Sequence, residues 1–268
     1  MKNKFKKLIN ILVVSGIIAT MVGCTNSSKE DKNVSNIKDS KEVIVGFDNT
    51  FVPMGFLDDK GETVGFDIEL AKETFNRLNM DVKFQPIDWT MKETELNSGN
   101  VDLLWNGYSL SEERKKVIEY TDSYLENKQI IITLKDSDIK TKKDLKGKKI
   151  GTQQGSTALD AIEKDTEVVK NLYGKAPILY DTYDKALRDL EIGRTDAVVG
   201  DEVLARYYIS KKGEEKYNIL EDNFGIEDYV VAFKKGNTEL RDKVNDALKE
   251  IKDDGSFKKI YSKWFKSN

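Results

Sequence analysis

The sequence of 268 residues contains no histidine and a single cysteine, Cys24. Without histidine, the Ser-His-Asp and Cys-His catalytic arrangements and histidine-based zinc sites are excluded. One cysteine cannot form a disulfide within the chain. Arginine is scarce, with six among 44 basic residues, so an arginine in an unusual place needs a reason. The net charge is −3 and no stretch is persistently basic, so we expect no nucleic-acid partner. We also expect no metal or cofactor.

The first residues have the layout of a secretory signal. Four lysines precede a mostly apolar run, Leu8–Val22, which is shorter than the ~20 residues that span a bilayer. The ending Met21-Val22-Gly23-Cys24 resembles the bacterial lipobox, although that motif prefers Leu at the position of Met21. We predict a lipoprotein signal peptide over residues 1–23 and a lipid on Cys24. The alternative is an uncleaved anchor helix, and either version places the remainder outside the cytoplasm.

Residues 24–40 are predicted to be a flexible tether. They include no aromatic residue, and only Val34 and Ile37 are sizeable apolar side chains. Such a segment cannot bury enough surface to order itself. The tether would hold the folded part just off the outer face of the membrane.

From Lys41 onward short apolar strands alternate with amphipathic helices. Val43–Phe47 reads as a buried strand, and Asp67 is placed to cap a helix with a periodic apolar face that includes Ile68 and Phe75. Strands are also expected at Val82–Phe84, Val101–Trp105 and Lys148–Thr152, and a helix near the C-terminus. This alternation predicts an α/β fold with helices on the faces of its sheets.

One phrase of the sequence occurs twice. Residues 95–104 and residues 189–198 both read as a helix end, a glycine stop and a strand that opens with aspartate, Asp102 or Asp196. Two copies indicate two similar lobes. Coincidence between two common helix–glycine–strand joints is the alternative.

The segment from Asn106 to Arg114 follows the third expected strand, at the end where open α/β sheets bind ligands. Gly107 allows a close backbone approach and Ser109 offers a hydroxyl. Ser111 is placed to cap the next helix, whose first turn holds Arg114, against the helix dipole. Binding an anion is one reason for that placement. A surface ion pair with Glu112 or Glu113 is the alternative.

Three further features follow other expected strands. Gln153 to Thr157, including Ser156, forms a turn at a helix start, which suits an anion, and Thr157 with Asp160 fits a capping box. Asp201 either caps the next helix or pairs with an ammonium group. Phe51, which follows Asp48, and Trp89 offer aromatic walls, unless they belong to the core.

These motifs together resemble family 3 of the extracellular solute-binding proteins, which serve ABC importers of polar amino acids. The resemblance rests on Gly65–Ala71 (GFDIELA) and on the ending Asp254–Ile260, with the segments described above in the same order between them. It covers nearly all of the chain after the tether. Two departures are Met54-Gly55, where a Pro and an aromatic residue are common, and Asn106, which is larger than usual.

The resemblance implies a role for each candidate residue. Arg114 would bind the carboxylate of a free amino acid, helped by Ser109 and by the helix start at Ser156 and Thr157. Gln153 would offer a neutral polar contact to the ligand. Asp201 would bind the ammonium group, and the chain around Asn106 and Gly107 would complete that end. Phe51 and Trp89 would flank the ligand side chain, and Asp48 would line the cleft. The side chain is expected to be neutral and polar, as in glutamine or cystine, while Asp48 and Glu202 leave cationic ligands open.

The family fold implied is a two-lobe α/β structure of the periplasmic-binding-protein type. It has two mixed sheets flanked by helices, a ligand cleft between the lobes and a hinge of two strands. We predict lobe 1 at residues 41–132 plus 229–268, lobe 2 at 133–228, and the crossings at Gln129–Thr133 and Tyr229–Phe233. A monomeric binding lipoprotein that delivers its ligand to membrane permease subunits would follow.

Two other functions compete with this interpretation. An enzyme on the same fold, similar to cyclohexadienyl dehydratases, would need a general acid, for which Asp48 or Glu202 is available. The lack of histidine and the presence of Asp201 favour binding without catalysis. The sensor module of a signalling protein is a third alternative, and the ending at Asn268 argues against it.

Overall fold

The computed structural model describes residues 42–265. The predicted signal peptide, Cys24 and the tether lie outside the described residues. Within residues 42–265, no helix combines the length and the apolar character that crossing a membrane requires.

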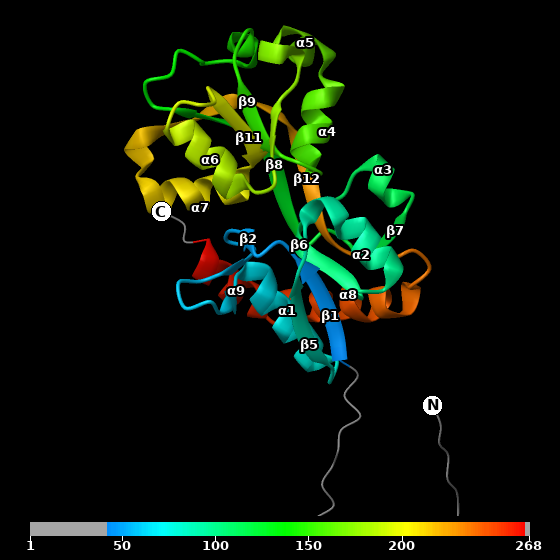
Figure 1. The fold of residues 1–268 in the computed structure, drawn as a ribbon. Coiled ribbons are helices and arrows are strands. Elements are labelled where there is room, and N and C mark those ends of the chain that lie inside the picture. Colours follow the sequence, from blue (N-terminus) through cyan, green and yellow to red (C-terminus); the bar gives the residue numbers. More distant parts are fainter. Residues whose placement is uncertain (1–41, 266–268) are drawn as a thin grey trace, which may run out of the picture. The chain divides into compact units, whose positions relative to one another are not determined.

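The larger group of elements, here called lobe 1, is built on parallel strands (Figure 1). β1 pairs in parallel with β5 on one side and with β6 on the other. Helices lie along this sheet, and a small antiparallel sheet of β2, β3 and β4 lies beside it. The elements are β1 (Glu42–Phe47), β2 (Thr50–Phe51), β3 (Gly55–Leu57), β4 (Thr63–Val64), α1 (Phe66–Arg77), β5 (Asp81–Pro86), the 3-10 turn Trp89–Met91, α2 (Lys92–Ser98), β6 (Leu103–Ser109), α3 (Glu112–Lys115), β7 (Ile118–Tyr120), α8 (Thr238–Asp253) and α9 (Ser256–Trp264).

The second group, here called lobe 2, repeats the parallel arrangement on a smaller scale. β9 lies between β10 and β11 and is parallel to both. The elements are the 3-10 turn Lys142–Leu145, β9 (Ile150–Gln153), α4 (Thr157–Lys164), α5 (Thr166–Asn171), the 3-10 turn Tyr173–Lys175, β10 (Ile178–Tyr180), α6 (Tyr183–Glu191), β11 (Ala197–Asp201), α7 (Glu202–Lys212) and the 3-10 turn Glu214–Lys216.

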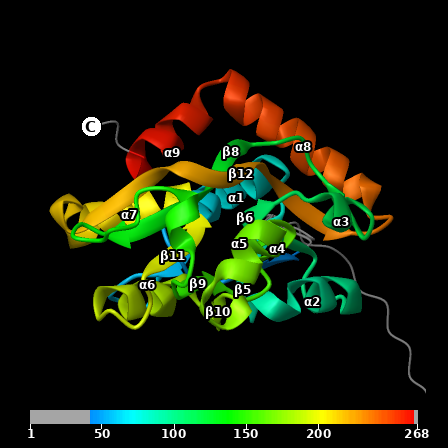
Figure 2. The same ribbon diagram turned by 90° about the horizontal axis from the view of Figure 1, so that it is seen from above.

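Two long strands, β8 (Leu125–Leu134) and β12 (Tyr217–Lys234), run through both lobes. They pair with each other antiparallel and lie side by side in both ribbon views (Figures 1 and 2). β12 also pairs with β6 in lobe 1, and β8 pairs with β11 in lobe 2. The two mixed sheets are therefore joined into one hydrogen-bonded path. The predicted crossings lie inside these strands, while the exact limits of the lobes stay a prediction.

The two copies of the repeated phrase make the same hydrogen bonds. The Asp102 carboxylate accepts the Ile44 N–H at 2.8 Å, and the Asp196 carboxylate accepts the Lys149 N–H at 2.7 Å. In each copy the aspartate N–H returns a bond to the carbonyl of that same partner. In both lobes, therefore, this aspartate holds the start of one parallel strand beside the next.

The helix predicted after Gly65 forms as α1, with Ile68, Ala71 and Phe75 fully buried. Burying a side chain of this size contributes roughly 1.5–3 kcal/mol, so the apolar face places the helix against the sheet. The prediction that Asp67 caps the helix is wrong. Asp67 is inside the first turn, and its Oδ2 accepts the Gly107 N–H at 2.7 Å and the Tyr124 hydroxyl at 2.9 Å.

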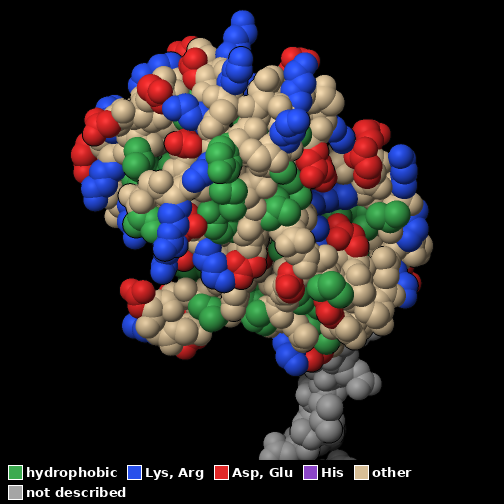
Figure 3. All heavy atoms as spheres, turned by 45° about the horizontal axis from the view of Figure 1, so that its top comes forward, with side chains coloured by type: hydrophobic (Ala, Val, Ile, Leu, Met, Phe, Trp, Pro, Cys, Tyr) green, Lys and Arg blue, Asp and Glu red, His purple; other side chains and the backbone are tan. Residues whose placement is uncertain are grey.

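The surface carries charges of both signs. On the face shown in Figure 3, acidic and basic side chains are interspersed, with smaller apolar groups between them. Ion pairs such as Lys164 with Glu113, at 3.2 Å, link exposed groups. Among residues 42–265, no cluster of three or more His, Cys, Asp or Glu side chains is arranged to hold a metal ion.

Candidate functional site

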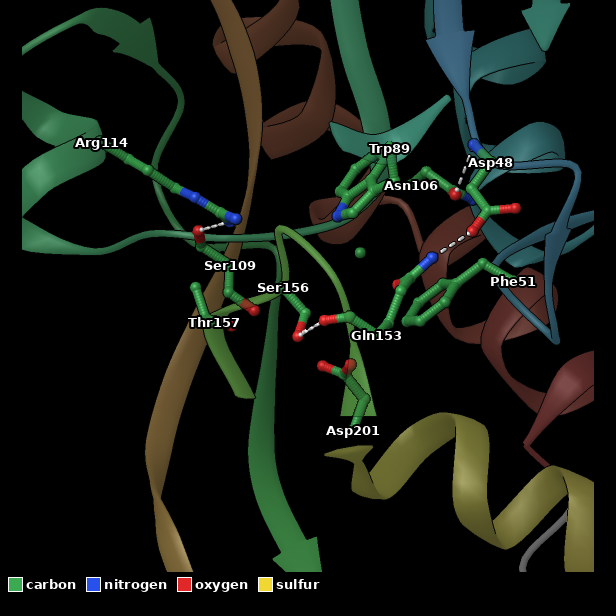
Figure 4. A pocket seen from close by; sticks show the side chains of 11 residues that line it. Asp48, Phe51, Trp89, Asn106, Ser109, Arg114, Gln153, Ser156, Thr157 and Asp201 are labelled. Carbon is green, nitrogen blue, oxygen red and sulfur yellow. Dashed lines mark hydrogen bonds between the residues drawn. The ribbon is translucent and has the colours of Figure 1, made fainter. Parts of the chain in front are cut away.

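A cavity lies where the two lobes meet. Its lining contains all eleven residues proposed from the sequence, and Figure 4 shows their side chains converging on it from both lobes. They are Asp48, Phe51, Trp89, Asn106, Gly107, Ser109, Arg114, Gln153, Ser156, Thr157 and Asp201. The structure thus brings the candidates together, and their role in binding stays a prediction.

The topology explains why residues so far apart in sequence meet. Asp48 follows the last residue of β1, and Asn106 to Ser109 form the end of β6. Gln153 ends β9 and Asp201 ends β11. β1 and β6 are parallel neighbours, as are β9 and β11, so their carboxyl ends lie at one edge of each sheet. The two edges face each other across the cavity, as expected for ligand sites of α/β sheets.

Arg114 is only 8% exposed and reaches across the cleft. Its Nη1 donates to the Ser109 carbonyl at 2.8 Å, and its Nη2 donates to the Gly155 carbonyl of lobe 2 at 3.0 Å. The guanidinium also lies 4.5 Å from the centre of the Tyr108 ring. The alternative of a surface pair with Glu112 or Glu113 is wrong, because the Arg114 side chain is buried and its hydrogen bonds end on Ser109 and Gly155.

Asp201 is buried, and its side chain makes no capping bond to α7. Its Oδ1 accepts hydrogen bonds from the side chains of Asn127, Gln129 and Tyr229, all on the two crossing strands. Burial, and next the nearby Glu227 carboxylate, raise the pKa of Asp201 to about 7 against the opposing effect of these bonds. An ammonium group beside this carboxylate would favour its charged form and so oppose that shift in pKa.

The start of α4 forms the wall of the cavity on the side of lobe 2. Ser156, and not Thr157 as predicted, is the N-cap, and its Oγ accepts the Leu159 N–H at 3.2 Å. The Thr157 hydroxyl instead donates to Oε2 of Glu227 at 2.8 Å. The first N–H groups of a helix have no acceptor within it, so this end suits an anion.

The remaining wall is aromatic and amide-lined. Phe51 packs against Tyr183 with ring centres 6.0 Å apart, so aromatic groups of the two lobes meet there. Oδ2 of Asp48 accepts the Gln153 side-chain amide at 2.8 Å, which also joins the lobes. Burial raises the pKa of Asp48, while two hydrogen bonds from Thr50 and one from Gln153 lower it. The Asp48 carboxylate is thus already hydrogen-bonded by neutral groups.

The two departures from the family pattern are neighbours in space. The Asn106 Nδ2 lies 2.6 Å from the position that a Cβ on Gly55 would occupy. The Asn106 Oδ1 accepts the Asp48 N–H at 3.0 Å. The absence of a side chain at residue 55 therefore makes room for the larger residue at 106, which in turn fixes the backbone of Asp48.

Gly107 has a positive φ of 57°, and a Cβ there would lie 2.7 Å from the Phe51 ring. Only glycine accepts this conformation without strain and lets the aromatic wall approach the end of β6. Glycine at this position therefore serves both the turn of the strand and the shape of the cavity.

Sequence reasoning missed several residues around the cavity. Asn127 and Gln129 are buried on β8, but in the sequence they belong to the polar run Glu126–Gln129, and no local signal separated them from their neighbours. Glu227 had no local signal either. Glu202, nominated from the sequence, does not line the cavity and pairs with Arg206 at 2.5 Å and with Lys128 at 3.6 Å.

Comparison with known proteins identifies the family of this chain. The model of the bacterial extracellular solute-binding proteins, family 3, matches residues 43–267. The chain belongs to this family. The match includes both lobes and both crossing strands, so the resemblance drawn from the sequence motifs is confirmed.

Individual relatives match over most of their length. The L-cystine-binding protein TcyJ of Escherichia coli (strain K12) is 30% identical, over 92% of each chain. The arginine-binding extracellular protein ArtP of Bacillus subtilis (strain 168) is 30% identical, over 97% of this chain and 98% of the relative. The substrate-binding protein of an ABC uptake transporter from Streptococcus pneumoniae, solved with bound histidine, is 39% identical, with a TM-score of 0.82. The match covers 84% of this chain and 93% of that structure. The two-lobe fold is confirmed by that likeness.

Proposed function

We propose that this protein binds a free L-amino acid in the cleft between its lobes and delivers it to the permease of an ABC importer. The observation that carries the proposal is that one cavity is lined by both a buried arginine, Arg114, and a buried aspartate, Asp201. A free amino acid carries the two complementary charges.

The carboxylate of the ligand would bind Arg114 and the start of α4. A guanidinium carries five N–H donors. The bonds to Ser109 and Gly155 use one N–H on each terminal nitrogen, which leaves a second N–H on each for a ligand carboxylate. A bidentate pair of this kind is stronger than a bond between neutral groups. The Thr157 N–H at the start of α4 would add to it.

The ammonium group would bind Asp201. The three bonds from Asn127, Gln129 and Tyr229 all end on Oδ1, which keeps the carboxylate in place and leaves Oδ2 for the ligand. Because Asp201 makes no capping bond to α7, the carboxylate is not committed to the helix.

For the side chain we propose a neutral polar group. Phe51 and Trp89 supply flat apolar surface, and Gln153 supplies an amide. Asp48 accepts three hydrogen bonds from neutral donors, so most of its acceptor sites are already used and few are left for a cationic side chain. Among the relatives, the cystine-binding protein agrees with this preference, whereas those named for arginine and histidine bind basic amino acids.

We further propose that the chain is a monomeric lipoprotein held on the outer face of the cytoplasmic membrane by a lipid on Cys24. The membership in an extracellular family supports the location, and the position of the only cysteine supports the anchor. Mass spectrometry of Cys24-containing peptides from the membrane fraction tests the lipid. An unmodified cysteine there would contradict it.

A thermal-shift screen tests the ligand. The chain without its first 24 residues is heated with each amino acid, including cystine and the basic ones, because a ligand bound only by the folded state raises the melting temperature. We expect the largest rise with a neutral polar amino acid. A rise only with arginine, lysine or histidine would refute the side-chain preference, and no rise with any amino acid would refute the function.

The same protein tests the enzymatic alternative. Of the two acids nominated as a general acid, only Asp48 lines the cavity. We propose binding without catalysis, and therefore expect no turnover of prephenate or arogenate by protein that binds an amino acid. Turnover would replace the binding function with the dehydratase one.

A further inference from the structure

Lys92 is a buried lysine that does not line the cavity described above. It begins α2 in lobe 1 and is 3% exposed. Its Nζ donates to the Trp89 carbonyl at 3.1 Å and to the Gly155 carbonyl of lobe 2 at 2.9 Å. A cation of one lobe therefore ends on the backbone of the other, beside the cavity and outside its lining.

The acceptor is shared with the arginine of the site. Nη2 of Arg114 donates to the same Gly155 carbonyl, at 3.0 Å. A carbonyl oxygen has two lone pairs and accepts both donors. Two cations of lobe 1 thus meet one oxygen of lobe 2, which lies just before the start of α4.

Glu93 holds both cations in lobe 1. Its Oε2 lies 3.2 Å from Nζ of Lys92, and its Oε1 lies 3.8 Å from Nε of Arg114. The Tyr108 hydroxyl donates to Oε1 at 3.0 Å. One carboxylate between two cations leaves a net positive charge, which the Gly155 carbonyl dipole partly offsets.

The lobes also fit closely at this point. Gly155 has a φ of 73°, and a Cβ there would lie 3.4 Å from Nζ of Lys92 and 3.4 Å from Cα of Thr90. The backbone of lobe 2 is therefore in van der Waals reach of lobe 1. If the lobes separated, this carbonyl would leave both cations at once.

Burial of the ammonium group has a cost that the closed arrangement offsets. Desolvation, and next the charge of Arg114, lower the pKa of Lys92 to about 8, while Glu93 and the more distant Asp160 act in the opposite direction. A buried charge is tolerated where its hydrogen bonds are made. The bond to Gly155 is the one that depends on the position of lobe 2.

We propose that Lys92 is a positioning residue that holds lobe 2 against lobe 1 through the Gly155 carbonyl, independently of any ligand. It would set the fraction of closed molecules before binding, and so the affinity of a cavity that it does not line. The proposal rests on the proposed function only in that ligand binding and closure are coupled.

The distance between the lobes in ligand-free protein tests the proposal. Spin labels are placed on cysteines at Asn97 of α2 and Glu163 of α4, two exposed positions on opposite lobes, in a chain that carries Cys24→Ser. Pulsed electron resonance then measures the distribution of distances. We expect Lys92→Met to lose at least half of the short-distance population and Lys92→Arg to keep most of it, because only the arginine retains a cation.

Lys252→Met is the control. Lys252 is an exposed lysine whose Nζ donates to the Ser123 carbonyl at 2.9 Å, and both residues belong to one side of the cleft. Its loss should leave the distances unchanged. Should Lys92→Met fail to fold, Lys92→Gln is measured in the same way.

Two results would overturn the proposal. One is an unchanged distribution in Lys92→Met, and the other is a wild-type protein that shows only the long distance. Because no amino acid is added, neither result depends on whether the proposed ligand binds. Failure of the amino-acid screen with a clear effect of Lys92→Met would refute the function and leave the positioning role intact.

Discussion

The two charged ends of the cavity are built differently. Asp201 belongs to lobe 2, and the groups that hold it come from β8 and β12, the strands that run through both lobes. Arg114 belongs to lobe 1, and its two hydrogen bonds end on one carbonyl of each lobe. The aspartate end is therefore complete within lobe 2 and the crossing strands, whereas the arginine end is complete only when the lobes are together.

This difference assigns the two ends separate tasks. A carboxylate bonded by Asn127, Gln129 and Tyr229 is held by the crossing strands, and it needs no contact from the parallel strands of lobe 1 to receive an ammonium group. The arginine end gains contacts upon closure, and a ligand that bridges both ends favours the closed form by that difference. Four changes to the chain or to the pH would sharpen or break the comparison.

The largest effect is expected from Arg114→Ala. Removing the guanidinium leaves a ligand carboxylate desolvated without its partner, so binding should weaken by roughly 2–5 kcal/mol. Titration calorimetry with the amino acid selected by the screen measures the loss. Arg194→Ala, an exposed arginine that pairs with Asp189, serves as the control. Unchanged affinity in Arg114→Ala would place the binding site elsewhere.

Asp201→Asn should have the next largest effect, and a selective one. The amide keeps the shape but loses the charge, so amino acids should bind about 1.5–3 kcal/mol more weakly. Analogues without the amine should bind as they do to the wild type. Competition assays with both ligand types measure the difference, and equal losses for the two would contradict the ammonium role.

Gly55→Ala should lower the free energy of unfolding by about 1–3 kcal/mol, because the new methyl group would meet the Asn106 amide and the Phe47 ring. Combining it with Asn106→Ala should recover part of that loss. Denaturant unfolding of the two single variants and the double variant measures the coupling. Additive losses would show that the two residues do not compensate each other.

The smallest effect concerns pH. Because the pKa of Asp201 is raised to about 7, the ligand-free carboxyl holds a proton below that pH, and the proton must leave when an ammonium group binds. Affinity should therefore rise with pH up to about 7 and level above it. Below 7 the loss is at most tenfold per pH unit, about 1.4 kcal/mol.

Calorimetry in buffers of different ionisation enthalpy detects the released proton. Glu227→Gln removes the neighbouring charge that helps to raise the pKa of Asp201, so in this variant the decline should begin at a lower pH. An affinity that is independent of pH between about 5 and 8 would contradict a raised pKa at an Asp201 that binds the ammonium group.

Local sequence signals were sufficient for much of the fold. Apolar periodicity located α1 and α8 with their buried residues, and the glycine stops at residues 99 and 193 marked the ends of helices before strands. The same signals did not identify the N-cap of α4, where two neighbouring hydroxyl residues were both candidates. Ser156 and not Thr157 caps α4, because the Thr157 hydroxyl is bonded to Glu227, a residue distant in sequence.

The sequence by itself determined the strand ends and helix starts that line the cavity. These positions follow from local signals, namely apolar periodicity, glycines and capping residues that are close together in the chain. Only the tertiary structure decided which distant groups meet. Lys92 and Arg114 share the Gly155 carbonyl, and the Asn106 side chain lies where a side chain on residue 55 would otherwise be. The reason is physical. A hydrogen bond or a close contact between segments of two sheets depends on how those sheets are placed, and no local pattern records that placement.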